Sequence, residues 1–586
     1  MLVFEHLSRG ASLAALAEGS TATPPRFIRP SPSIRRAGQP LPLIYVLVFA
    51  CIPIGKAQYC ARMIERVKAW FTAHPSRLPW VWALTLLLVA LWPRVFSLDS
   101  MLNGDAIVYW SKRIPQFWEG LASGEYEKTF QTHPGVTLMW ASGFFQKLAG
   151  VLDVAPSEEF IIPAKLPIAL FASLLVVANY ALLRRLLSPE GEALAILSSL
   201  AMATEPFVVF HSRTLHVDTF FAGFAWLAVL FGLLAIRERK YSWALACGVS
   251  LGLGLLSRAV CITICVGLGS WFVFEIARRR DQRKRLIVLL VLVVISTAVT
   301  AVLLWPALLH DPIETFRKLV SRTSDMVSRG HRLFFMGKVH SRDPGAAYYL
   351  VLLALRTSPE MMLGLIGGAF GLVGIVRKPE WRPLLGLFVS YALLLLILMT
   401  SAKKGGRYML ALYPPLIVLS TCGFLGVFDL LRAKFSDARF VQFSLSFAFL
   451  LLVLRGARLL AIHPFPIAWC PEYPGLRCEE VITVSGTQGL REVALYLREH
   501  HEGGERAKVY RTAYVSSLRP WYQPRMVRKP KQAEYFLSFL TERQRNWGVA
   551  PMMPYIQGRD PVLTVEINGV RYAELFLGPA HPDYHP

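Results

Sequence analysis

The sequence predicts an all-α polytopic membrane protein that ends in a small soluble α/β domain. Of its 586 residues, 54% are hydrophobic, and the mean hydropathy is +0.42. Many apolar runs are long enough to cross a bilayer. The net charge of +24 does not indicate nucleic-acid binding, because the basic residues stand in short clusters between apolar runs. The positive-inside rule produces this pattern.

About eleven transmembrane helices are expected when most basic clusters are placed in the cytoplasm. The amino terminus then lies inside and the carboxyl terminus outside. Residues 134–151 are interpreted as a helix lying at the membrane interface, because a crossing here would move later basic clusters to the outside. The expected spans are 79–96, 163–183, 193–210, 219–236, 241–257, 259–276, 286–309, 361–376, 384–400, 409–428 and 441–454.

The topology divides the chain into three parts. Residues 1–78 are a basic cytoplasmic extension, in which 41–54 could form an extra hydrophobic helix. Residues 79–454 form the transmembrane domain, with large outer loops at 98–162 and 310–344. The second of these loops holds seven Lys or Arg residues. This loop is either a solvated face near anionic headgroups or an electropositive mouth for an anionic, phosphate-bearing lipid.

The tail, residues 455–586, has the composition of a soluble domain and is placed outside the cell membrane. Its residues 489–500 have the apolar spacing of a helix, and 562–576 alternate around an Asn-Gly pair, which predicts a β-hairpin. Cys470 and Cys478 form a candidate disulfide if this tail faces an oxidising compartment.

Two carboxylates stand out at the outer ends of the expected spans. Asp105 follows the first span within a few residues, and Asp218 opens the fourth. A charge at a bilayer boundary needs water, a partner or a ligand, and a short acidic side chain cannot snorkel. Both acids are therefore predicted catalytic residues, although Arg213 could instead form a structural ion pair with Asp218.

Cationic side chains occur at the same ends of the spans. Two carboxylates with several cations suit the transfer of a group from a phosphate to a hydroxyl or amine. The carboxylate would take the acceptor proton, while cations or a metal ion would stabilise the departing phosphate. Taken singly, each of these cations is more simply interpreted as a side chain that anchors its helix at the membrane interface. The predicted phosphate-binding residues are Arg213, Arg258, Lys403, Lys404 and Arg407.

A divalent metal ion is a further hypothesis, with His133 and His331 as tentative ligands. No pair of histidines has tight ligand spacing, so polar loop histidines are the simpler interpretation. The sequence contains no phosphate-binding glycine-rich loop, and no organic cofactor is expected.

Several short motifs, taken in order, resemble a known family. The chain is similar to the GT-C glycosyltransferases of the protein O-mannosyltransferase and aminoarabinose lipid A transferase type, glycosyltransferase family 39 in the broad sense, over residues 79–454. The motifs are Asp105, HPGVTLMW at 133–140, SRTLHVD at 212–218, GLGLLSR at 252–258 and SAKKGGRYMLALYPPL at 401–416.

The resemblance implies a polyprenyl-phosphate-linked sugar donor and inversion at the anomeric carbon. The family's first-loop acid matches Asp105, and the acid opening the fourth span matches Asp218. The basic residue after the fifth span is matched by Arg258, where relatives usually carry Lys. The Lys or Arg before the tenth span is matched by the basic residues of 403–407. Many relatives have Asp-Glu in the first loop, whereas Ala106 follows Asp105 here.

The resulting hypothesis is a membrane glycosyltransferase on the outer face of a bacterial plasma membrane. Its acceptor, a protein, lipid or cell-envelope glycan, is left open. The alternative is a transporter or flippase for an anionic lipid or lipid-linked sugar. That class would predict interrupted helices at midplane and repeat symmetry, neither of which the sequence shows. A non-catalytic scaffold would tolerate the loss of Asp105.

Overall fold

The computed structural model describes residues 78–585 except 132–133, 154, 189–190, 329–331, 378–380, 433–436, 472, 474–475, 485 and 502–504. The chain divides into two compact units, Met1–Leu78 and Pro79–Pro586. The expected basic extension and the hydrophobic helix at 41–54 lie outside the described residues. The described residues belong to the second unit, apart from Leu78, the first residue of its opening helix.

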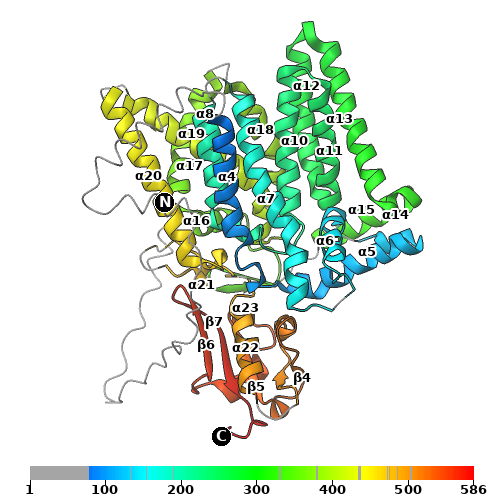
Figure 1. Cartoon of the computed structure of the whole chain (residues 1–586), viewed down its shortest axis with the longest axis vertical. Coiled ribbons are helices and arrows are strands. Elements are labelled where there is room, and N and C mark those ends of the chain that lie inside the picture. The colour runs from blue at the N-terminus through cyan, green and yellow to red at the C-terminus, as the bar shows by residue number, and fades with distance from the viewer. Residues whose placement is uncertain are drawn as a thin grey trace. The chain divides into compact units, whose positions relative to one another are not determined.

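Long helices lie side by side in this unit and form a bundle (Figure 1). The helices of the bundle are α4 (Leu78–Val95), α7 (Glu158–Leu186), α8 (Glu192–Thr204), α9 (Pro206–His211), α10 (Asp218–Glu238), α11 (Tyr241–Ser257), α12 (Ile262–Arg278), α13 (Arg283–Leu304), α17 (Pro359–Arg377), α18 (Arg382–Thr400), α19 (Tyr413–Arg432) and α20 (Asp437–Ile462).

Seven helices in the described part of the chain are long and apolar enough to cross a membrane, which confirms a polytopic helical membrane protein. They cover Leu78–Ser100, Glu158–Leu186, Asp218–Glu238, Ala259–Arg278, Arg280–Leu304, Arg382–Thr400 and Gly406–Leu431.

The other expected spans are helical but differ in length. The expected span 193–210 is two helices, α8 and α9, because Pro206 cannot donate to the ladder of α8 and starts a new helix. The span 241–257 is the 17-residue α11, and 361–376 and 441–454 fall within α17 and α20. The expected interfacial helix is α6 (Val136–Leu148), whose 13 residues reach about 20 Å, short of the hydrocarbon thickness.

Small residues let neighbouring helices approach closely. A Cβ added to Gly423 of α19 would lie 2.0 Å from the Gly364 carbonyl oxygen of α17. Gly248 and Gly252 of α11 face α13 in the same way, and a Cβ on Gly248 would lie 1.8 Å from the Ser296 Oγ. Gly248 and Gly252 have the small-xxx-small spacing that membrane helices use for close contact.

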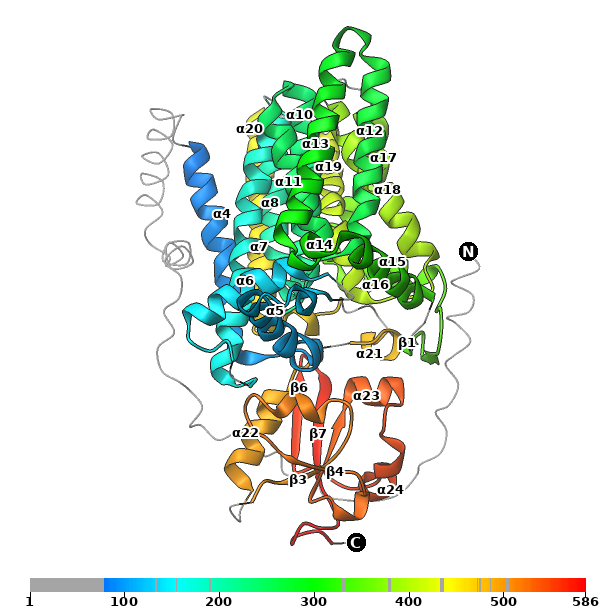
Figure 2. The ribbon, with the colours of Figure 1, turned by 90° about the vertical axis from the view of Figure 1, so that its right-hand side faces the viewer.

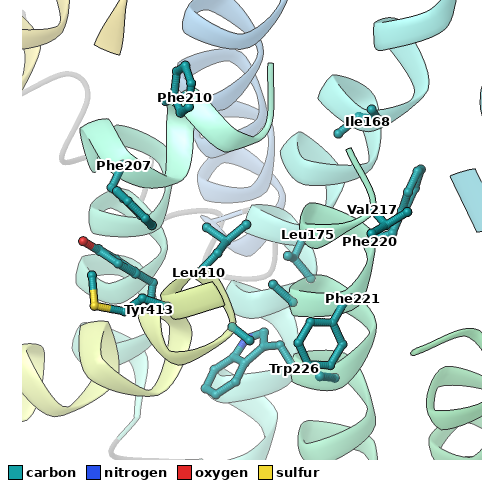
Figure 3. Close-up of a cluster of buried hydrophobic side chains, with 14 of the residues drawn as sticks. Ile168, Leu175, Phe207, Phe210, Val217, Phe220, Phe221, Trp226, Leu410 and Tyr413 are labelled. Carbon is teal, nitrogen blue, oxygen red and sulfur yellow. The ribbon is translucent and has the colours of Figure 1, made fainter. Parts of the chain in front are cut away.

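Large apolar side chains fill the bundle next to the helix ends that will carry the site. Figure 3 shows Phe207 of α9 beside Tyr413, with Phe210 at one end of the cluster and Trp226 of α10 at the other. The Phe207 and Tyr413 rings stack with centroids 4.7 Å apart. All four side chains are at most 6% exposed. This packing gives the polar residues above it a rigid base.

The C-terminal domain is built on a five-stranded mixed sheet of order β4-β3-β5-β7-β6 (Figure 2). Antiparallel β6 and β7 form the predicted hairpin, and both residues of its Asn568-Gly569 turn have positive φ, as a two-residue hairpin loop requires. Cys470 and Cys478 form a disulfide. The elements are α22 (Leu490–His500), β3 (Lys508–Tyr510), β4 (Arg525–Val527), β5 (Tyr535–Phe539), α23 (Leu540–Arg545), α24 (Met553–Ile556), β6 (Leu563–Ile567) and β7 (Val570–Leu577).

Two loop regions contact this domain. The first outer loop contains α5 (Ser111–Ser123), η5 (Tyr126–Thr129) and α6. The second follows α14 (Pro306–His310) and contains α15 (Pro312–Ser328) and a small hairpin of β1 (Leu333–Phe335) and β2 (Lys338–His340). The turn of that hairpin donates from Met336 N to the Val481 carbonyl oxygen, at 2.6 Å. Figures 1 and 2 both place α5, α6, α14 and α15 at the end of the bundle nearest the C-terminal domain.

Candidate functional site

Asp105 stands at the entrance to α5, on a loop that is held from two sides. It precedes a π-helical turn, η4 (Ala106–Trp110), that runs directly into α5. From the bundle, the buried Lys165 Nζ donates to the carbonyl oxygens of Leu98, at 2.6 Å, and Met101, at 2.7 Å. From the C-terminal domain, Thr487 Oγ1 donates to the Leu102 carbonyl oxygen at 3.0 Å. The loop therefore presents Asp105 from a fixed backbone.

Asp218 is the first residue of α10 and is almost fully buried. A carboxylate at this position benefits from the positive end of the helix dipole. His216 lies just before it, in the short connection from α9, and its ring stands edge-on to Trp110 with centroids 6.1 Å apart. The polar connection between α9 and α10 thus places His216 and Asp218 next to each other.

These two segments meet in one cluster with a third, η9 (Gly406–Leu412), which begins the helix pair η9–α19. His216 bridges the two acids, with Nε2 3.5 Å from Asp105 Oδ2 and Nδ1 2.7 Å from Asp218 Oδ2. Arg407 also contacts both acids: it pairs with Asp105, and its Nε lies 3.6 Å from Asp218 Oδ2. The two predicted catalytic acids are therefore neighbours in space.

Arg258 supplies the second cation of the cluster. It follows the last residue of α11 and pairs with Asp218 through Oδ1. Its guanidinium also lies over the Tyr408 ring, 4.6 Å from the centroid, and Arg407 lies 5.8 Å from the same centroid. Such a cation over a ring face is stabilised by the ring quadrupole. Tyr408 thus sits between the two arginines.

The charges of the cluster balance when His216 is neutral. Burial lowers the pKa of His216 and outweighs the two carboxylates beside it, so the imidazole is neutral at pH 7. Burial alone would raise the pKa of Asp105, but Arg407 and His216 outweigh burial and hold it below its ordinary value. Asp105 is therefore ionised at neutral pH, as a base must be.

Residues 134–137 of the first outer loop close one side of the cluster. Gly135 has a φ of +56°, and a Cβ there would lie 2.4 Å from the Trp110 ring, so this position needs glycine for both reasons. Gly135 N donates to the Ser257 carbonyl oxygen, and Thr137 Oγ1 lies 2.7 Å from Ser257 Oγ. The segment thereby fixes the end of α11, from which Arg258 extends.

Two of the predicted phosphate-binding cations have other partners. Arg213 donates to the carbonyl oxygens of Pro93, Phe96 and Ser97 at the end of α4, at 2.5 to 2.7 Å. Asp218 takes its contacts from Arg258, His216 and Arg407, so the alternative ion pair between Arg213 and Asp218 is not the arrangement formed. Arg213 acts as a cap on α4.

Lys404 is also a helix cap. Its buried Nζ donates to the carbonyl oxygens of Met399, at 3.0 Å, and Ser401, at 2.9 Å, at the end of α18, and lies 3.5 Å from Asp343 Oδ1. Lys403 differs, because its side chain is half-buried and its ammonium has no ion-pair partner in the described part of the chain. Of the two lysines, Lys403 is the one available to an anion.

The tentative metal ligands His133 and His331 lie outside the described residues. Among the residues that are described, no group of three or more His, Cys, Asp or Glu side chains could hold a metal ion. The Asp105 and Asp218 carboxylates already face two arginines.

His216, Tyr408 and Trp110 complete the cluster, although they were not among the predicted catalytic or phosphate-binding residues. For His216, the spacing of two residues from Asp218, in a polar break between apolar helices, was the available signal. For the two aromatic residues the sequence offers no signal beyond their adjacency to charged positions.

Comparison with known proteins bears on this cluster directly. Residues 135–305, which carry Asp218, His216 and Arg258, match the family model described as dolichyl-phosphate-mannose-protein mannosyltransferase. The resemblance to the GT-C glycosyltransferases is confirmed. The match covers less than a third of the chain and leaves out Asp105 and Arg407, which the structure brings to the same place.

Solved structures of GT-C enzymes are similar at greater distance. The archaeal oligosaccharyltransferase AglB from Archaeoglobus fulgidus, in complex with an inhibitory peptide and a dolichol-phosphate, gives 12% identity and a TM-score of 0.46 over 81% of this chain and 70% of that one. ArnT from Cupriavidus metallidurans bound to undecaprenyl phosphate gives 16% identity and a TM-score of 0.45 over 86% of this chain and 99% of that one. No curated protein matches the sequence.

Proposed function

We propose that this membrane protein transfers a sugar from a polyprenyl-phosphate-linked donor to a hydroxyl or amine on the extracytoplasmic face. The observation that carries the proposal is the meeting of two acids and two arginines, Asp105, Asp218, Arg258 and Arg407, from four separate segments in one partly buried cluster. All four stand at helix ends, where a lipid-anchored substrate can reach them from the bilayer.

In the proposed reaction, Asp105 is the base. The acceptor oxygen or nitrogen attacks the anomeric carbon while its proton passes to the Asp105 carboxylate. The bond from the anomeric carbon to the phosphate oxygen breaks, and the electron pair leaves with the polyprenyl phosphate. Attack opposite the leaving group inverts the anomeric carbon. Asp105 is partly exposed, whereas Asp218 is almost fully buried, so Asp105 is the acid that an acceptor can approach.

The departing phosphate needs positive charge, and Arg407 is placed to supply it. Its guanidinium contacts both acids, so a phosphate that binds Arg407 competes with Asp105 for the same nitrogen atoms. Binding of the donor would thereby free the Asp105 carboxylate for the acceptor proton. Lys403 offers a second cation, which has no ion-pair partner among the described residues, while Asp218 holds Arg258 and His216 in position.

The extracytoplasmic assignment is supported by the distribution of charge. The basic clusters at 184–185, 237–240 and 277–285 lie at the opposite ends of α7, α10 and α12 from the acid cluster. The positive-inside rule places those ends in the cytoplasm. The C-terminal domain shares the end of the bundle that carries Asp105, because Thr487 and Arg491 contact residues of the Asp105 loop.

The acceptor can be a protein, a lipid or a cell-envelope glycan, and one experiment separates these. Glycolipids, envelope polymers and proteins from cells with and without the chain are compared by mass spectrometry. We expect one class to lose a sugar when the chain is absent and to regain it with the unchanged chain but not with Asp105→Asn. An unchanged sugar content in every class would refute the proposal.

A further inference from the structure

The second outer loop contains an amphipathic helix, α15, whose apolar side is only partly used. In both views of the ribbon, α14 and α15 run across the direction of the long helices at the end of α13 (Figures 1 and 2). One side of α15 is seated on the protein: Thr315 Oγ1 donates to the Ala307 carbonyl oxygen at 2.9 Å, and Leu319 packs against the hydrophobic core.

A second apolar side of α15 faces no part of the described chain. Ile313 is 82% exposed, Phe316 63% and Val320 52%, and Leu309 of α14 is 57% exposed. On α15, spacings of three and four residues place Ile313, Phe316 and Val320 in one stripe, and Leu309 is exposed on α14 just before it. Large apolar side chains so exposed in a row mark a contact surface rather than scattered surface residues. We name Leu309, Ile313, Phe316 and Val320 the α15 stripe.

The α15 stripe continues a surface that faces lipid. On the preceding helix α13, one of the seven candidate spans, Val294, Ile295, Val299 and Leu303 are exposed apolar residues. A transmembrane helix with such a face meets the acyl chains of the bilayer. Because α13, α14 and α15 follow one another directly, the apolar surface passes from the end of the span onto the helix that lies across it.

Basic side chains accompany the stripe. Arg317 follows Phe316 directly and is exposed, and Lys318 is next to it. Both contact Glu314, which offsets one of their two charges. Over the whole loop, residues 310–344, seven Lys or Arg stand against four Asp or Glu, an excess of three positive charges. Positive charge beside an apolar helix face is typical of helices that bind anionic membranes.

The corner between α13 and α15 is also fixed to the first outer loop. Ala307 N donates to Thr129 Oγ1 at 3.0 Å, and the Arg322 guanidinium lies 5.2 Å from the centroid of the Phe130 ring. The loop that starts at Asp105 and the helix with the exposed stripe are therefore held together. The surface that α15 binds therefore helps to position the first outer loop relative to the membrane.

We propose that α15 is an interfacial membrane helix that inserts the α15 stripe into the bilayer surface and binds anionic phospholipid headgroups through Arg317 and its neighbouring cations. The occupant of the stripe is the membrane in which the chain itself is embedded, because the stripe continues the lipid-facing surface of α13. The proposal does not depend on the transfer reaction and is tested without it.

The test uses the full-length chain in vesicles of phosphatidylcholine with one fifth phosphatidylglycerol. A photoreactive benzoylphenylalanine replaces Phe316 on the stripe or, as the matched control, Ser321 on the same helix. Five residues place these positions about 140° apart around the helix axis. We expect lipid adducts at 316 and few at 321, with the ratio of phosphatidylglycerol to phosphatidylcholine adducts about fivefold above the ratio in the vesicle, the effect of one basic residue near an anionic surface.

A second variant separates the two halves of the proposal. In Arg317→Ser/Lys318→Ser, the adducts at 316 should persist while the enrichment of phosphatidylglycerol falls to its mole fraction. A photoreactive group at Val320 repeats the measurement if the change at 316 prevents folding. Adducts of position 316 with a second copy of the chain, or with another segment of the same chain, would overturn the membrane assignment. Equal labelling of both lipids by the unchanged helix would overturn the headgroup assignment.

Discussion

Buried cations in this protein are satisfied in two different ways, in two neighbouring regions. In the candidate site, Arg258 and Arg407 face the carboxylates of Asp218 and Asp105. Around the ends of α4 and α18, the cations face backbone carbonyl oxygens instead. These carbonyl-bound cations are Arg94, Lys165, Arg213 and Lys404.

The difference separates structure from chemistry. The last carbonyl groups of a helix have no partner within the helix and carry partial negative charge, so a cation that reaches them caps the helix. A carbonyl oxygen does not titrate, and a cap of this kind can only hold the backbone. A carboxylate can take a proton, so an acid that shares its cation with a substrate can take part in a reaction. Four predictions follow this division, beginning with the largest expected effect.

Replacing the partly exposed acid should abolish transfer without harming the fold. In Asp105→Asn, the shape of the side chain is kept and the base is lost, which we expect to lower the transfer rate by about 10² to 10⁴-fold. Transfer is measured in membranes with a polyprenyl-phosphate sugar, and the amount of chain in the membrane serves as the control. Full activity in this variant would remove Asp105 from the reaction.

Removing a carbonyl-bound cation should act on stability. In Arg213→Gln, three carbonyl oxygens at the end of α4 lose their buried donor, and we expect the free energy of unfolding to fall by about 3 to 5 kcal/mol. The thermal midpoint of the purified chain reports this, with the exposed Arg317→Ser as the matched control. A variant of normal stability that has lost affinity for the donor would instead place Arg213 among the phosphate ligands.

Glu542 provides a third case, a buried acid in the C-terminal domain that faces neutral hydrogen-bond donors, the backbone of Tyr514 and Ala513 and the side chain of Thr512. Its Oε1 accepts from Tyr514 N at 2.8 Å, and burial raises its pKa to about 7. Because the folded chain holds this proton more tightly than the unfolded chain, the contribution to stability is complete below about pH 4.5 and is lost as the pH rises through about 7.

The change Glu542→Gln keeps the accepting oxygen and removes the titration. We expect it to stabilise the chain by up to about 3 kcal/mol at pH 8 and by less than about 1 kcal/mol at pH 5. Thermal midpoints of both chains at the two pH values measure the difference. A gain of the same size at pH 5 would show that the charge of Glu542 is not the cause.

The smallest expected effect concerns the pH dependence of transfer. Arg407 is the main charge that holds the pKa of Asp105 down against burial. In Arg407→Gln, the pKa of Asp105 should rise. On acidification, Asp105 should therefore become protonated, and stop acting as the base, at a higher pH than in the unchanged chain. We expect the acidic limb of the pH profile to move upward by about one pH unit or more, and Arg407→Lys to move it less. An unmoved limb would assign it to another group.

Several features of the protein could be predicted from local sequence. Apolar runs predicted the helical membrane protein. A run of about twenty apolar residues is long enough to span the bilayer, and in lipid its backbone hydrogen bonds are satisfied within a helix. The Asn568-Gly569 pair predicted the β6–β7 hairpin, since both residues adopt positive φ readily. Asp105 and Asp218 could be singled out because a short acid at a membrane boundary is costly unless it has a partner.

Only the tertiary structure decided which cation serves which acid. Arg213, five residues from Asp218, turns to the end of α4, while Arg407, 302 residues from Asp105, pairs with it. In the sequence, Arg213, Arg258, Lys404 and Arg407 look alike, since each is a basic residue at the end of an apolar run. Their roles depend on whether the packed helices bring a carboxylate or a row of carbonyl oxygens within reach, and no local pattern contains that distance.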